Sequence, residues 1–192
     1  MVKYNRRRVK AWAKSKVPFL IEKRLSIALV VLAMLLLYIF RDVIQMVAVM
    51  AAFIILGIFS LIYNRWIKLS LGAELVMLGT VVTGLVYGRW QALIVGVVAL
   101  FFAEVITDRF TYSTFVSFIG IFVVAMVAPM LQNVGITSAG ILMTILYDVI
   151  IAPGYLLMGS SPLRTTLFVA THILFNIWMF MFIAPFVFRL VA

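Results

Sequence analysis

The sequence predicts an all-α fold, specifically a polytopic integral membrane bundle with six to seven transmembrane helices. Hydrophobic residues make up 66% of the 192 residues, and the mean hydropathy is +1.23. Charged residues make up 11%, against about 25% in an average soluble domain. The apolar runs are continuous, whereas the strands of a membrane barrel alternate apolar and polar residues. This composition excludes a soluble enzyme, a disordered chain and a secreted disulfide scaffold.

Most of the positive charge lies near the N-terminus. Residues 1–24 contain nine Lys or Arg and one Glu, so +8 of the net charge of +10 lies there. A basic segment before the first span is typical of a cytoplasmic end. We therefore predict a basic cytoplasmic tail over residues 1–24, one transmembrane bundle over residues 25–192, and a multi-pass protein of the cell membrane. The position of the charge argues against a nucleic-acid partner, although such a tail can also bind anionic lipid headgroups or a partner protein.

Seven apolar runs are candidate spans, and polar or glycine-containing breaks separate them. In order, they cover residues 25–40, 44–63, 70–88, 90–107, 113–131, 138–158 and 165–188. The breaks are short, which predicts that consecutive helices are antiparallel neighbours. The first run has 16 residues, fewer than the about 20 that a full crossing needs. Seven spans place the C-terminus outside the cell, and six spans remain an alternative.

Small residues at four-residue spacing predict contact faces between helices, because membrane helices associate through close backbone packing. The pairs are Ala48 with Ala52, Gly84 with Gly88, and Ala92 with Gly96. Ordinary packing inside the bundle explains any one of these pairs. As candidates for docking a partner subunit we select Ala48, Ala52, Gly84, Gly88 and Gly96.

A few polar residues lie inside the apolar runs, where a charged group is costly and usually faces a cavity or a partner group. Glu104 and Asp108 are four residues apart, and His172 and Asn176 are spaced in the same way. The candidate substrate-binding residues are Glu104, Asp108, Asp148, His172, Asn176 and the nearby Trp178. For Glu74, expected one turn into the third span, a headgroup-level position at the helix start is an equally good interpretation.

The sequence contains no recognisable catalytic set. The spacing of His172 and Asn176 matches one motif of intramembrane prenyl-protein-type proteases, but the paired glutamates and the second histidine of those enzymes are absent. One histidine and no cysteine leave little for a metal site. We therefore expect no enzyme activity, no catalytic residue, no metal and no cofactor.

The middle of the chain resembles the substrate-capture (S) components of energy-coupling factor transporters. The matching positions are Gly84, Leu85, Tyr87, Gly88, Ala92, Gly96 and Glu104. The stretches that begin at Asp148 and His172 are similar to the final helices of such proteins. The bacterial rod-shape-determining membrane protein of the D type has a similar sequence pattern and is the alternative resemblance.

The resemblance to S components implies a membrane subunit that binds a vitamin-like small molecule and docks a coupling subunit, while partner ATPases hydrolyse ATP. Because S components typically have six spans with both termini inside, it also favours the lower span count. Two other functions remain open. One is a non-catalytic structural or accessory subunit of a larger membrane or cell-envelope complex. The other is a proton- or ion-coupled carrier that uses Glu104, Asp108 and Asp148.

Overall fold

A computed structural model describes residues 23–24, 26–66 and 71–192 of the chain. Contacts divide the chain into two compact units, Met1–Gln45 and Met46–Ala192, and each is described by itself. Every regular element in the described ranges is a helix, which confirms the all-α fold class for that part of the chain. The predicted basic tail over residues 1–24 lies almost entirely outside the described residues.

The first unit contains an apolar helix over Ser26–Ile39. The Phe40 N–H donates to the Leu36 carbonyl and the Ile44 N–H to the Phe40 carbonyl, both at 2.9 Å. Helical hydrogen bonding therefore continues through the position where a polar break was expected, and that break is not a loop. The Arg41 guanidinium instead forms a 3.0 Å ion pair with the neighbouring Asp42.

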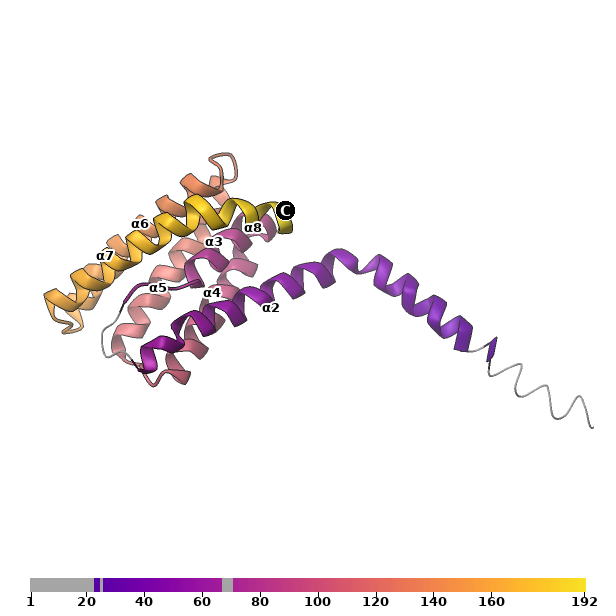
Figure 1. Ribbon diagram of the computed structural model, residues 1–192, viewed down its shortest axis with the longest axis horizontal. Coiled ribbons are helices and arrows are strands. Elements are labelled where there is room, and N and C mark those ends of the chain that lie inside the picture. The colour runs from indigo at the N-terminus through magenta and orange to yellow at the C-terminus, as the bar shows by residue number, and fades with distance from the viewer. Residues whose placement is uncertain (1–22, 25, 67–70) are drawn as a thin grey trace, which may run out of the picture. The chain divides into compact units, whose positions relative to one another are not determined.

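The second unit is built from consecutive helices, labelled in Figure 1, and residues 41–45 at the start of α2 belong to the first unit. The elements are α2 (Arg41–Leu61), η1 (Ile62–Arg65), α3 (Val76–Tyr87), α4 (Arg89–Ile106), α5 (Tyr112–Val127), η2 (Ala128–Leu131), α6 (Ile136–Leu157), α7 (Pro162–Trp178), η3 (Met179–Ile183) and α8 (Ala184–Val191). In the described ranges, five helical stretches are long and apolar enough to cross a membrane. They are Arg41–Arg65, Arg89–Ile106, Tyr112–Leu131, Ile136–Leu157 and Pro162–Val191. A helical multi-pass membrane protein is consistent with these lengths and compositions.

The span expected over residues 70–88 is wrong in its first part. Residues 71–75 are not helical, and α3 begins only at Val76. Twelve residues of helix extend about 18 Å, less than the about 30 Å of a bilayer core. Every residue of α3 from Val76 to Leu85 is buried, and the helix contacts α4, α5, α6 and α8. A half-length helix therefore occupies the centre of the unit.

The non-helical segment before α3 has its backbone groups bound by side chains of neighbouring elements. The Gly72 N–H donates to Thr171 Oγ1 at 2.9 Å, and the Leu75 N–H donates to Ser60 Oγ at 2.9 Å. The Tyr63 hydroxyl donates to the Leu71 carbonyl at 2.5 Å. Irregular backbone at membrane depth is tolerated where protein groups satisfy it. Side chains from α2, η1 and α7 therefore make the break in this passage possible.

The small residues selected as candidate contact faces lie in two environments. Gly84 and Gly96 are buried, and a Cβ on either would approach atoms of this chain's own helices. At Gly96 it would come within 2.6 Å of Thr80 and Ile121 side chains. Gly88, with φ +102°, forms the turn between α3 and α4. Ala48 and Ala52 lie on the exposed side of α2, so they are the members of this set that a partner can reach.

Two prolines inside the apolar runs have different effects on their helices. Pro153 lies inside α6, which continues as a helix to Leu157. Pro185 lies in the first turn of α8, directly after the π-helical turn Met179–Ile183. Proline has no N–H to donate to the preceding turn, and a π-turn accommodates such a lost hydrogen bond. The last span is therefore one continuous helical passage, Pro162–Val191, with a local widening.

Candidate functional site

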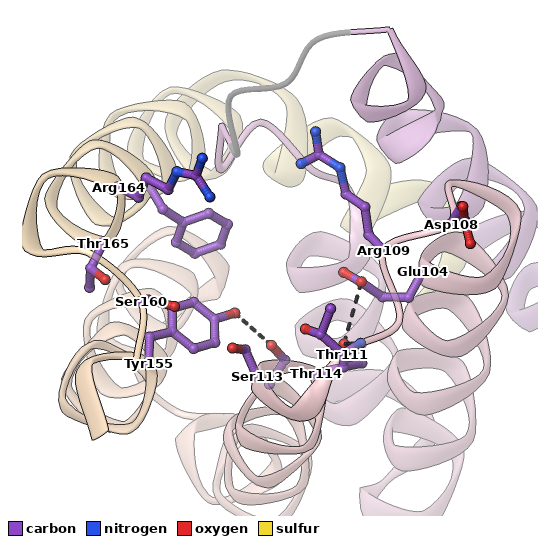
Figure 2. A pocket seen from close by; sticks show the side chains of 12 residues that line it. Glu104, Asp108, Arg109, Thr111, Ser113, Thr114, Tyr155, Ser160, Arg164 and Thr165 are labelled. Carbon is purple, nitrogen blue, oxygen red and sulfur yellow. Dashed lines mark hydrogen bonds between the residues drawn. The ribbon is translucent and has the colours of Figure 1, made fainter. Parts of the chain in front are cut away.

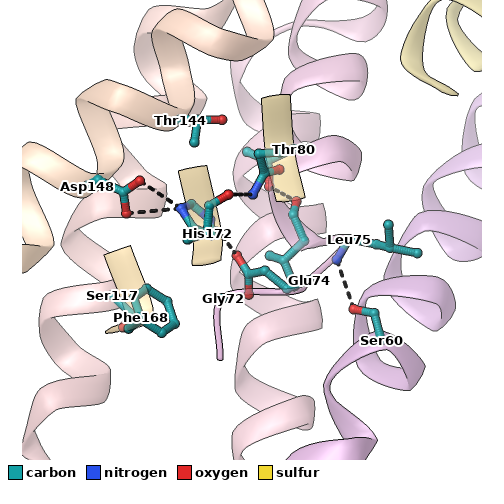
Figure 3. Close-up of polar contacts among 12 residues, drawn as sticks. Ser60, Gly72, Glu74, Leu75, Thr80, Ser117, Thr144, Asp148, Phe168 and His172 are labelled. Atoms are coloured by element: carbon teal, nitrogen blue, oxygen red, sulfur yellow. Dashed lines mark hydrogen bonds and ion pairs between the residues drawn. The ribbon is translucent and has the colours of Figure 1, made fainter. Parts of the chain in front are cut away.

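Three ionisable side chains meet in the interior of the second unit, as Figure 3 shows. His172 Nδ1 lies 2.9 Å and 3.0 Å from the two carboxylate oxygens of Asp148. His172 Nε2 lies 3.4 Å from Glu74 Oε1. His172 is 0% exposed, Asp148 3% and Glu74 4%. We call Glu74, His172 and Asp148 the buried triad.

Each member of the buried triad comes from a different element. Asp148 lies in the middle of α6, His172 in α7, and Glu74 in the non-helical segment before α3. Gly72 allows this segment to approach α7 closely, because a Cβ at Gly72 would lie 2.5 Å from the His172 Cα. The break before α3 and the glycine within it therefore bring a carboxylate to the histidine.

Aromatic rings and an amide hold the imidazole in place. The Phe168 ring stacks on the His172 ring with a centroid distance of 5.5 Å and an angle of 12°. The Tyr147 ring lies 5.2 Å away in a tilted arrangement. The Asn176 side chain donates from Nδ2 to the His172 carbonyl at 3.0 Å. Because packing restricts the ring, its two nitrogens point at the two carboxylates.

The hydrogen-bonding capacity of the buried triad is not filled. Glu74 Oε1, His172 Nε2 and Asn176 Oδ1 are buried without a hydrogen-bond partner in the described part of the chain. An unpaired buried polar atom costs about 1–3 kcal/mol. These atoms therefore mark a place where a proton or a small polar species would be stabilising.

A pocket of about 430 Å³ opens between the ends of α4 and α6 and the starts of α5 and α7, as Figure 2 shows. Its lining residues are Glu104, Asp108, Arg109, Thr111, Ser113, Thr114, Ser117, Tyr155, Ser160, Arg164, Thr165 and Phe168. Phe168 belongs to both sites, because it lines the pocket and stacks on His172. The pocket and the buried triad are therefore neighbours.

The charged groups of the pocket are held by local hydrogen bonds. Glu104 Oε2 accepts from the Thr114 hydroxyl at 3.5 Å, and Arg109 Nη1 donates to Asn64 Oδ1 at 3.1 Å. Asp108 follows the end of α4 in the left-handed region, with φ 57°, which aspartate and asparagine adopt more readily than most other residues with a side chain. Thr165 Oγ1 is buried with no partner in the described ranges. The pocket thus presents both charge signs and an available hydroxyl.

The six candidate binding residues are divided between these places. Glu104 and Asp108 line the pocket. Asp148, His172 and Asn176 lie together in the interior. Trp178 is 50% exposed and contacts Phe175, outside both groups.

Sequence reasoning did not assign Glu74 to the interior. It treated the residue as part of a regular span, where a position near the headgroups is reasonable. Gly72, two residues before Glu74, was the available signal, because a glycine next to an acid in an apolar run can indicate a break in the helix.

Taken together, the long apolar helices suggest a class of protein, a helical multi-pass membrane protein, and the buried triad is a polar cluster within its mainly apolar interior. No family model matches the chain, and neither the curated proteins nor the solved structures give a match. Among the described residues, no group of three or more His, Cys, Asp or Glu side chains is arranged to hold a metal ion.

Proposed function

We propose that the protein is the membrane-embedded substrate-binding subunit of a multi-component micronutrient importer. The pocket among the later helices carries this proposal. Its volume of about 430 Å³ lies within the range of small-molecule sites, about 300–1,000 Å³.

The chemistry of the lining supports a small, polar, water-soluble ligand. Arg109 and Arg164 supply guanidinium donors, and Glu104 and Asp108 supply carboxylate acceptors. Hydroxyl groups lie between them, including the Tyr155 hydroxyl, which is 2.6 Å from Ser117 Oγ. Such a lining can pair with both ends of a molecule that carries donor and acceptor groups. Vitamin-like compounds have this character.

Ligand binding is expected to raise the thermal stability of the purified protein. A ligand at 100 times its Kd adds about 2.7 kcal/mol to the free energy of unfolding. Thermal unfolding would be measured in mild detergent against a panel of water-soluble vitamins. A compound that stabilises the protein should lose this effect in Glu104→Gln and in Arg164→Ala, and keep it in Asp42→Asn, which alters an exposed acid on α2. If no compound stabilises the protein, an accessory role replaces the binding role.

The importer role can be tested by determining whether the pocket opens to the outside of the cell or to the cytoplasm. With a cytoplasmic N-terminus, seven crossings place the pocket inside the cell and six place it outside. Capture of a nutrient requires the outer side. Six crossings require Ser26–Leu61 to cross once, and the helical hydrogen bonds through Phe40 favour this. The nine basic residues in the first 24 then remain inside, as the positive-inside rule requires.

Single cysteines are expected to report this orientation directly, because the chain contains none of its own. Tyr112→Cys lies at the pocket end and Asn133→Cys in the turn after η2, and both positions are exposed. In intact cells, a membrane-impermeant maleimide should label Tyr112→Cys and not Asn133→Cys. The reverse pattern would place the pocket in the cytoplasm and end the capture proposal. Labelling of both variants after cell lysis is the control.

The exposed side of α2 offers a surface on which a partner subunit can dock. Ala48 and Ala52 are exposed there at four-residue spacing, which permits close helix approach. The importer proposal therefore places its partner on this helix and its ligand in the pocket.

A further inference from the structure

The buried triad carries more negative than positive charge whenever both of its carboxylates are ionised. With an imidazolium at His172 the sum is −1, and with a neutral imidazole it is −2. An isolated buried charge is strongly unfavourable, and groups in such a site bind protons to approach neutrality. One proton added to the imidazole changes the charge of the triad from −2 to −1. Such a coupled cluster titrates as a unit.

The geometry separates the two sides of the imidazole. On one side, Nδ1 lies within hydrogen-bonding distance of both Asp148 oxygens, at 2.9 Å and 3.0 Å. On the other side, Nε2 and Glu74 Oε1 face each other at 3.4 Å, and both are buried without a hydrogen-bond partner in the described ranges. The first contact suits a permanent pair. In the second contact, neither Nε2 nor Glu74 Oε1 has another hydrogen-bond partner in the described ranges, so a proton can be bound and released between them.

We propose that Glu74 Oε1 and His172 Nε2 form a binding site for one exchangeable proton, with Asp148 as the permanent counter-charge on Nδ1. Binding adds a proton to His172 Nε2 and converts the open contact into a charge-assisted hydrogen bond from Nε2 to Glu74 Oε1. Release leaves the imidazole with a single proton on Nδ1, directed at Asp148. No other bond is made or broken.

The surroundings of this site contain few competing ionisable groups. From α6, Tyr147 faces the imidazole, and Tyr155 lies within electrostatic range of Glu74. From η1, Tyr63 also lies within electrostatic range of Glu74. From α7, the neighbours are Phe168, which has no ionisable group, and Asn176. From α4, Glu104 lies within electrostatic range of Glu74, and Arg109 lies within range of Glu104. Glu104 lines the pocket, so a charged ligand there would act on the proton at Glu74.

One side chain lies between the proton site and the pocket. The Phe168 ring lies with one face on the imidazole and also lines the pocket. The Phe168 ring therefore separates the imidazole from the pocket.

The single histidine of the chain makes a direct test possible. Full-length protein labelled with ¹⁵N-histidine and held in lipid nanodiscs gives ring signals from His172 alone. Between about pH 5 and about pH 10, a range that brackets the ordinary pKa of histidine, we expect one step in which the Nε2 signal moves from protonated to deprotonated. Nδ1 should remain protonated throughout. An Nε2 signal that stays in one protonation state across this range would overturn the proposal.

Variants identify the second atom of the site. Glu74→Gln and the shorter Glu74→Asp are expected to move the midpoint of the Nε2 step by about one pH unit or more, and Asp42→Asn is expected to leave it unchanged. Phe168→Ala should accelerate exchange of the Nε2 proton with water several-fold. An unchanged midpoint in both Glu74 variants would show that Glu74 is not part of the site. The experiment uses no ligand, so its result is independent of the importer proposal.

Discussion

Replacing His172 with alanine is expected to destabilise the protein by about 3–5 kcal/mol, the usual effect of removing one partner from a buried ion pair. The substitution leaves Glu74 and Asp148 in the interior with no cationic partner from the triad. It also removes the ring that stacks between Phe168 and Tyr147. The free energy of unfolding would be measured by titration with a denaturing detergent.

A triple variant separates charge from packing in this prediction. Glu74→Gln and Asp148→Asn, added to His172→Ala, neutralise the two carboxylates and keep the same cavity. We expect this protein to recover a large part of the lost stability, because neutral amides are far less costly to bury than carboxylates. If the triple variant is as unstable as His172→Ala alone, lost packing causes the effect and the charges are not coupled.

Replacing Gly72 with alanine is expected to destabilise the protein by about 3 kcal/mol, at the upper end of overpacking effects. The added Cβ would lie 2.5 Å from the His172 Cα and 2.6 Å from the His172 backbone nitrogen. Backbone atoms in a helix cannot rotate away, so the non-helical segment must move. That movement would withdraw Glu74 from Nε2. Thermal unfolding would measure the stability, and the His172 ring signals would report the lost contact.

Gly159→Ala is the matched control for this substitution. Gly159 has φ +86°, and no atom lies within 4 Å of an added Cβ. Only the left-handed backbone disfavours alanine there, by about 1–2 kcal/mol. The His172 signals should not change. A Gly72→Ala protein that behaves like Gly159→Ala would show that the segment does not press against α7.

The helical fold was accessible from the sequence because it follows from composition and run length. Lipid leaves no water to satisfy the backbone, so a continuous apolar run of sufficient length becomes a helix. The runs at residues 90–107, 113–131 and 138–158 agree closely with α4, α5 and α6. The same reasoning failed at residues 71–75, because run length records hydrophobicity and does not record which neighbouring side chains can bind an irregular backbone.

The sequence identified most of the polar residues of the candidate site. It did not predict which of them lie close together in space. Asp148 and His172 were recognised because charged and polar groups are rare in apolar runs. Glu74 was given a headgroup-level alternative, because a regular helix would place it near the interface. In the structure it is 4% exposed and faces a histidine 98 positions away in the sequence. Helix rotation and the depth of a side chain depend on packing, which one sequence does not specify.

The sequence by itself determined that the chain is helical and apolar, with a basic N-terminal segment and a small set of interior polar residues, since each of these follows from local composition. Only the tertiary structure decided which polar residues meet. The half-length α3, the close approach at Gly72 and the stacking of Phe168 bring Glu74, His172 and Asp148 together beside the pocket. The physical reason is that a buried charge needs a partner close in space, and that partner can lie far away in the sequence. Packing of distant segments brings the two together.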